Sequence, residues 1–209
     1  MSVLRTFVAL ELDPASTQRL ERIARQLSKG NPGFTASTAD QMHLTLAFLG
    51  EVELNDLHQV SKIVQQSFED VDAFTLGLQD LGAFPHWQDP KVVWVGVAED
   101  GVDVDHLSEA ALERLGSAAY CPALTELQDQ MVQRFLDQRF WPDTKPFRPH
   151  ITLGRMRGGK GNRNLEIPDS VQQQVEAGLG QFPVDSVKVM SSESTSNGPV
   201  YRTISTLDL

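Results

Sequence analysis

We expect from the sequence an α+β protein built as two pseudo-symmetric lobes. Segments with helical spacing of apolar residues alternate with short β-branched and aromatic segments, which are typical of strands. A His-apolar-Thr-Leu segment occurs twice, at 43–46 and 150–153, 107 residues apart. Each copy is followed by a loop, a helix and two strands. Such a duplication predicts that residues 1–209 form one bilobal domain with a pseudo-two-fold axis.

The first half begins with a strand at 6–12 (TFVALEL), which ends at Asp13. Pro14 opens a helix, as proline does at a first turn, and the sequence GNPG at 30–33 ends it. A strand follows at 43–48, and Asn55 or Asp56 caps a helix that continues to about Asp70. Its apolar residues recur every three or four positions. Two strands at 74–78 and 91–97 are joined by a link rich in turn-forming residues, GAFPHWQDP.

The second half repeats this order after a weakly patterned stretch. Residues 99–121 contain at most a short helix near 107–115, whereas 122–139 form a clear helix with one apolar face. The second motif strand lies at 150–153 and is followed by a basic, glycine-rich loop at 157–164. Pro168 and Asp169 start a short helix, and strands at 184–190 and 200–207 close the chain.

Composition limits the classes of partner. The chain has 18 Lys and Arg against 28 Asp and Glu, a net charge of −10. Binding along a nucleic-acid track requires clustered cations, so this protein is expected to bind RNA ends or small nucleotides instead. No apolar run approaches the ~20 residues that span a bilayer, and the first residues do not resemble a leader peptide. With Cys121 as the sole cysteine, these features predict a cytoplasmic protein without membrane contact.

The doubled motif carries the chemistry. Alternation along a strand points His43 and Thr45 to one face, and His150 and Thr152 do the same in the second copy. A random chain of this composition would contain only ~0.05 such motifs, so two copies in equivalent places indicate function. If the lobes face each other, two imidazoles and two hydroxyls converge on one pocket. Imidazoles exchange protons near neutral pH, and threonine hydroxyls donate to phosphate oxygens.

Two other interpretations of the motif compete with this one. A single histidine on a strand is most often a hydrogen-bonded structural residue, but that interpretation does not account for the pair. A metal centre fits poorly, because zinc prefers three or four His, Cys or carboxylate ligands and no Asp, Glu or Cys near the motifs completes such a set.

These residues resemble the two-histidine (2H) phosphoesterase superfamily, whose mark is one H-x-T-x motif in each lobe. The nearer likeness is to its RNA 2',3'-cyclic phosphodiesterase branch, historically called 2'-5' RNA ligases. It rests on RTFVALEL, HLTLAFLGEV, VVWVGV, FRPHITLGR and the terminal Tyr201, and so covers nearly the whole chain. The resemblance implies antiparallel sheets around a central groove. Residues 99–121 depart from it as a possible insertion.

The resemblance also implies a reaction. By this resemblance, the protein would hydrolyse an RNA 2',3'-cyclic phosphate to a 2'-phosphate without metal or other cofactor, with His43 as proton donor and His150 as proton acceptor. Thr45 and Thr152 can donate hydrogen bonds to the non-bridging oxygens. One histidine must be protonated and the other neutral, which predicts a bell-shaped pH profile for kcat/KM.

Three further residues are candidates for substrate binding, each with a structural alternative. Arg155 can reach the phosphate or form an ion pair, and Phe48 can stack on a base or pack in the core. Arg148 can steer RNA phosphates or remain solvated. Other functions stay open: a 2'-5' RNA ligase, a 2'-5' oligonucleotide phosphodiesterase, or a non-catalytic nucleotide-binding module. A monomer is expected, because the groove lies within one chain.

Overall fold

The computed structural model describes residues 2–103, 107–108, 116–157, 165–196 and 198–209. Within that part of the chain, no helix is long and apolar enough to cross a membrane. The elements in order are β1 (Val3–Glu11), α1 (Pro14–Gly30), β2 (Phe34–Ala36), β3 (His43–Glu53), α2 (Leu57–Phe68), β4 (Phe74–Phe84), β5 (Val92–Glu99), α4 (Pro122–Asp137), β6 (His150–Met156), α5 (Asp169–Glu176), β7 (Gln181–Val184), β8 (Ser186–Thr195) and β9 (Gly198–Asp208).

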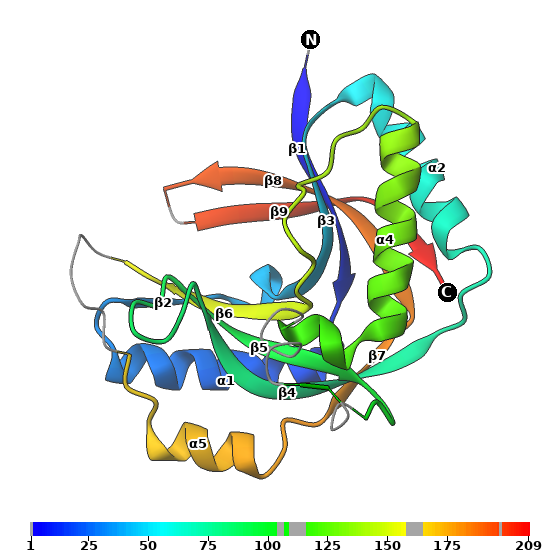
Figure 1. Ribbon diagram of the computed structural model, residues 1–209. Coiled ribbons are helices and arrows are strands. Elements are labelled where there is room, and N and C mark those ends of the chain that lie inside the picture. The colour runs from blue at the N-terminus through cyan, green and yellow to red at the C-terminus, as the bar shows by residue number, and fades with distance from the viewer. Residues whose placement is uncertain (1, 104–106, 109–115, 158–164, 197) are drawn as a thin grey trace.

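The described strands form one curled, antiparallel, nine-stranded sheet (Figure 1). Its order is β7-β4-β5-β6-β3-β1-β8-β9, and β2 pairs with β6 beside this path. The two halves of the sheet meet between β3 and β6, where Leu44 and Ile151 are the paired residues. The predicted α+β class is therefore confirmed, and the two motif-bearing strands lie next to each other at the centre.

Strands are exchanged between the two halves of the sequence. The strands that follow the first motif, β4 and β5, lie beside β6, which carries the second motif. The strands that follow the second motif, β8 and β9, join β3 through β1. Each half of the sheet is thus completed by strands from the opposite half of the chain, which ties the two motifs into one structure.

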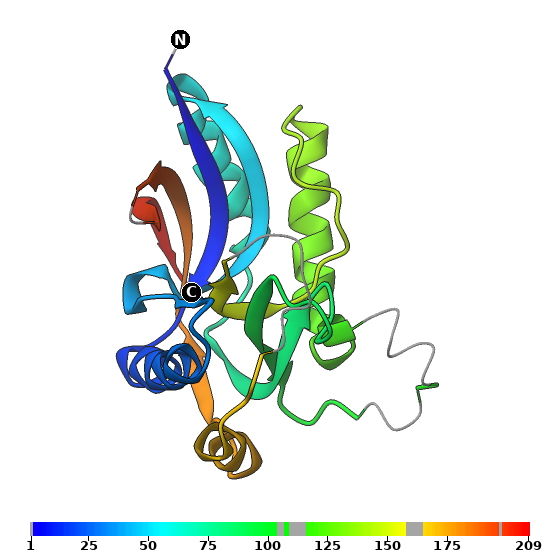
Figure 2. The ribbon, with the colours of Figure 1, turned by 90° about the vertical axis from the view of Figure 1, so that its left-hand side faces the viewer.

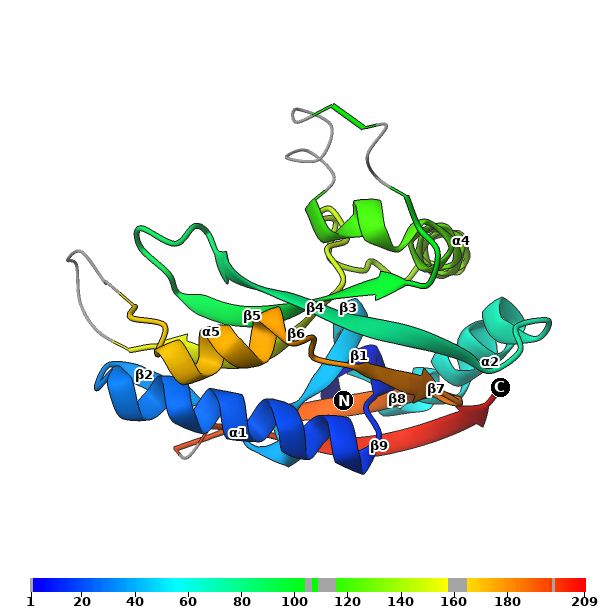
Figure 3. The same ribbon diagram turned by 90° about the horizontal axis from the view of Figure 1, so that it is seen from below.

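Helices cover the outer face of this sheet. Helix α1 begins because the carboxylate of Asp13 accepts hydrogen bonds from the first free N–H groups, with Ala15 N 3.1 Å away. It lies beside α5 and against β2 and β6, as Figure 3 shows. Helix α2 packs on β8 and β9 and against α4, which lies beside it in Figure 1. Figure 2 shows α2 behind β1 and β3. The apolar faces of the helices and the inner residues of the strands form the main core.

Several predicted boundaries change. Strand β4 continues through Phe84, so the GAF of the expected turn belongs to the strand instead. Asp56 precedes α2 but makes no side-chain cap hydrogen bond. Two short strands, β2 and β7, were not predicted, because three or four residues carry too little periodicity. Residues 104–106 and 109–115, which include most of the short helix expected near 107–115 and part of the possible insertion 99–121, fall outside the described residues, as do residues 158–164 of the loop expected at 157–164.

Candidate active site

The four motif side chains line one groove at the junction of β3 and β6. The alternation holds: Leu44 and Ile151 are buried in the core, while the neighbouring histidines and threonines face the other side of the sheet. The groove has a volume of about 570 Å³. Its lining brings together most of the predicted site residues: His43, Thr45, Phe48, His150, Thr152 and Arg155.

His43 is held against two aromatic rings. The Phe7 ring on β1 lies 5.0 Å from the imidazole, and the Tyr201 ring on β9 meets it edge-on at 5.0 Å. A backbone hydrogen bond to Gln41 supports the protonated form. Burial outweighs it and, with a smaller contribution from repulsion by His150, lowers the pKa of His43 to about 4. In the free protein, this imidazole is neutral at pH 7.

His150 has equivalent surroundings in the other half of the sheet. The Phe84 ring on β4 meets it edge-on at 5.0 Å, and the Trp94 ring on β5 lies 5.9 Å away. Its Nδ1 lies 2.5 Å from the carbonyl oxygen of Arg148. A carbonyl only accepts, so Nδ1 carries the proton in the neutral ring and Nε2 is left for proton transfer. Burial lowers the pKa of His150, as does the Arg155 charge to a smaller degree.

The two histidines are therefore related by the pseudo-symmetry of the sheet. Each one has an edge-on ring at 5.0 Å and a second, tilted ring. Each also has a backbone hydrogen bond to the residue two positions earlier. The aromatic rings pack against both imidazoles, and burial lowers the pKa of each histidine.

A glycine supports the wall behind His150. Gly82 pairs with Trp94 across β4 and β5. A Cβ atom at residue 82 would lie only 2.1 Å from the Trp94 ring, so this ring rests directly on the glycine backbone. The absence of a side chain at this position therefore allows Trp94 to lie flat behind the imidazole.

The other predicted binding residues divide between two environments. Arg155 lines the groove, is exposed, and has no acidic partner within the described part of the chain. Phe48 also lines the groove and is 53% exposed. The Arg148 side chain instead packs against Gly116 and does not line the groove. The contribution of Arg148 to the site is its carbonyl, which holds His150.

The sequence reasoning did not single out the aromatic wall residues Phe7, Phe84 and Trp94. Phe7 and Trp94 lie on predicted strands, but alternation does not reveal which strand becomes the neighbour of a motif strand. Phe84 was expected in the turn-rich link and lies instead at the end of β4. Tyr201 was noted only as part of the family resemblance. Among the described residues, no group of three or more His, Cys, Asp or Glu is placed to hold a metal ion.

Comparison with known proteins agrees with this geometry. The chain matches the 2'-5' RNA ligase superfamily over residues 11–195. It is 28% identical to an RNA 2',3'-cyclic phosphodiesterase of Archaeoglobus fulgidus, covering 95% of this chain and 97% of the relative. A Methanothermobacter thermautotrophicus protein of the same name is 25% identical, covering 95% of both chains.

Solved structures share the fold. Escherichia coli LigT complexed with 3'-AMP superimposes with a TM-score of 0.64 at 21% identity, covering 100% of this chain and 99% of the other. The protein TT0787 of Thermus thermophilus has the same TM-score at 24% identity, covering 99% and 98%. Sequence match, fold and the paired histidine-threonine strands agree, and this chain belongs to the 2'-5' RNA ligase superfamily.

Proposed function

We propose that this protein is an RNA 2',3'-cyclic phosphodiesterase that opens the cyclic phosphate to a 2'-phosphate without a metal ion. The observation that carries this proposal is the meeting of two histidines and two threonines in one groove, on adjacent strands that lie 107 residues apart in sequence. Relatives bearing that name, aligned over nearly the full chain, support the same activity.

In the proposed reaction, water attacks phosphorus and gives a proton to His150. The bond from phosphorus to the 3'-oxygen breaks, and His43 donates a proton to that oxygen. Thr45 and Thr152 donate hydrogen bonds to the non-bridging oxygens, where negative charge increases in the transition state. Arg155 adds a positive charge to the lining of the groove.

In this proposal, binding of the substrate changes the protonation state of His43. Both imidazoles are neutral in the free protein at pH 7, because burial disfavours the imidazolium form. The cyclic phosphate carries one negative charge, and a nearby anion raises the pKa of a histidine. Binding of the substrate therefore supplies the counter-charge that allows His43 to hold its proton until the 3'-oxygen leaves.

Phosphorus NMR of an oligoribonucleotide with a terminal 2',3'-cyclic phosphate, in EDTA, tests this proposal. Wild type is expected to yield only the 2'-phosphate, while His43→Ala and His150→Ala lose the activity. His58→Ala removes an exposed imidazole on α2 and serves as the control. Binding without turnover would favour a nucleotide-binding module. Formation or cleavage of a 2'-5' linkage would favour the ligase or the 2'-5' oligonucleotide phosphodiesterase.

Two further expectations belong to this proposal. The groove and all four motif side chains come from one chain, which supports action as a monomer. RNA ends as substrates also fit a cytoplasmic location. Sedimentation of the purified protein at assay concentration tests the first point, since a stable dimer would contradict it.

A further inference from the structure

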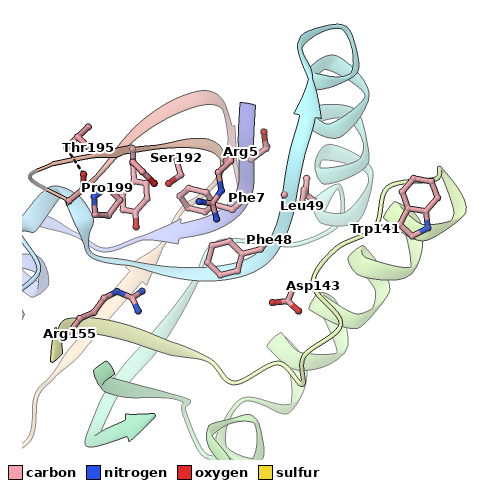
Figure 4. A pocket seen from close by; sticks show the side chains of 15 residues that line it. Arg5, Phe7, Phe48, Leu49, Trp141, Asp143, Arg155, Ser192, Thr195 and Pro199 are labelled. Carbon is pink, nitrogen blue, oxygen red and sulfur yellow. Dashed lines mark hydrogen bonds between the residues drawn. The ribbon is translucent and has the colours of Figure 1, made fainter. Parts of the chain in front are cut away.

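The histidine groove continues into a second hollow. This trough has a volume of about 710 Å³ and runs along β1 and β3 toward the loop after α4 (Figure 4). It is continuous with the groove, because the two share the lining residues Phe48, Arg155, Gly198, Pro199 and Tyr201. Whatever binds at the histidines can therefore extend into the trough without leaving the surface.

The trough carries positive charge in a protein whose net charge is −10. Arg5 and Arg155 both line it, and both lie close enough to Tyr201 to lower the pKa of its phenol against the effect of burial. Neither guanidinium has an acidic partner within the described part of the chain. The only acidic residue among the described lining residues is Asp143, and the Lys145 Nζ lies 2.9 Å from its carboxylate. The trough therefore offers two cations that form no ion pair in the described part of the chain, and Glu51 is the cross-strand neighbour of Arg5 on β3.

The trough also carries two exposed aromatic rings. Phe48 is 53% exposed, and Trp141 is 74% exposed. The loop that contains Trp141 is hydrogen-bonded to β3: the Asp143 N–H donates a hydrogen bond of 2.9 Å to the Phe48 carbonyl. Exposed aromatic rings beside cations are the usual platform for bases of single-stranded nucleic acid.

We propose that the trough binds the nucleotide immediately 5' of the cyclic phosphate, so that the preferred substrate is an RNA end of at least two nucleotides. This inference rests on the proposed function. Arg155 faces the cyclic phosphate, Arg5 faces the phosphodiester before it, and the preceding base stacks on Trp141 or Phe48. Two cations match two phosphates, which is consistent with recognition of a short end rather than a long track.

The test compares adenylyl-adenosine 2',3'-cyclic phosphate with adenosine 2',3'-cyclic phosphate. For wild type, kcat/KM is expected to be roughly tenfold or more higher for the dinucleotide, since one stacked base contributes about that factor. Trp141→Ala and Arg5→Gln are each expected to lower this ratio about fivefold or more. Trp87→Ala and Arg25→Gln remove exposed residues outside both hollows, and these controls should keep the wild-type ratio.

Salt dependence gives an independent readout for Arg5. Loss of one phosphate contact should reduce the slope of log kcat/KM against log salt by about 0.7 for the dinucleotide. An unchanged slope in Arg5→Gln would contradict the assignment of Arg5 to the phosphodiester.

Affinities of the two products separate failure of this inference from failure of the proposed function. Calorimetry with adenylyl-adenosine 2'-phosphate and adenosine 2'-phosphate should show tighter binding of the dinucleotide, weakened by Trp141→Ala. Equal affinities, or equal kcat/KM for the two cyclic substrates, would overturn the inference even if both are hydrolysed. Tighter dinucleotide binding without any hydrolysis would support the trough and refute the proposed function.

Discussion

Acidification should destabilise this protein through His43, before its carboxylates are affected. The ordinary pKa of a histidine is 6.5, whereas burial lowers the pKa of His43 to about 4 in the folded protein. The unfolded chain therefore binds a proton that the folded chain rejects. The stabilising effect is complete above pH 6.5 and is lost progressively as the pH falls toward 4.

The size of this effect follows from the lowered pKa. A change from 6.5 to about 4 corresponds to about 3 kcal/mol of unfolding free energy. His150 contributes in the same direction, because burial also lowers its pKa. The carboxylates of Asp13 and Asp143 have pKa values held below 3.8 by hydrogen bonds from Ser16 and Lys145, so their contribution is lost only at lower pH.

Urea unfolding of wild type and His43→Asn between pH 7.5 and 4 isolates the contribution of His43. Asparagine can still hydrogen-bond the backbone but does not titrate, so the variant should lose about 2–3 kcal/mol less than wild type over this range. His58→Asn, at an exposed position on α2, should follow wild type. Parallel losses in wild type and His43→Asn would refute the assignment of a neutral, buried His43.

Two further predictions concern the groove. Gly82→Ala should cost about 1–3 kcal/mol of stability and lower kcat, because the added Cβ would displace Trp94 from behind His150. Gly77→Ala on the same strand is the control and should do neither, because the atom nearest to its added Cβ would be 3.6 Å away. Calorimetric melting and initial rates check both variants, and equal behaviour would contradict the supporting role of Trp94. The bell-shaped pH profile of kcat/KM should have its maximum below pH 6.5, because kcat/KM reports the free protein and the pKa values of His43 and His150 are both lowered there. Initial rates at low substrate test this, and a maximum near pH 8 would contradict it.

The orientation of the motif side chains was the part of the site that the sequence predicted best, because the two motifs alternate between apolar and polar residues. Leu44 and Ile151 had to be buried for their strands to pack, which forced the histidines and threonines to the opposite face. The long helices could be predicted equally well, because α1 and α4 each have a proline in the first turn and a continuous apolar face.

The residues that contact the two histidines could not be predicted from the sequence pattern. Tyr201 contacts His43, and Phe84 contacts His150, because each half of the sheet contains strands from the opposite half of the sequence. Such long-range pairing depends on the packing of the whole chain, and a strand pattern does not encode its partner. The trough beside Trp141 was missed for a related reason: its lining comes from several strands and one loop.

The central claim is that His43 and His150 act together as one acid–base pair. The most direct measurement is the single-turnover rate of cyclic-phosphate opening by His43→Ala, His150→Ala and the double variant. If the two imidazoles serve the same step, the double variant should be no more than about threefold slower than the slower single variant, because groups that act as a unit are non-additive. If the rate losses of the single variants multiply in the double variant, the histidines contribute independently and the paired mechanism is wrong.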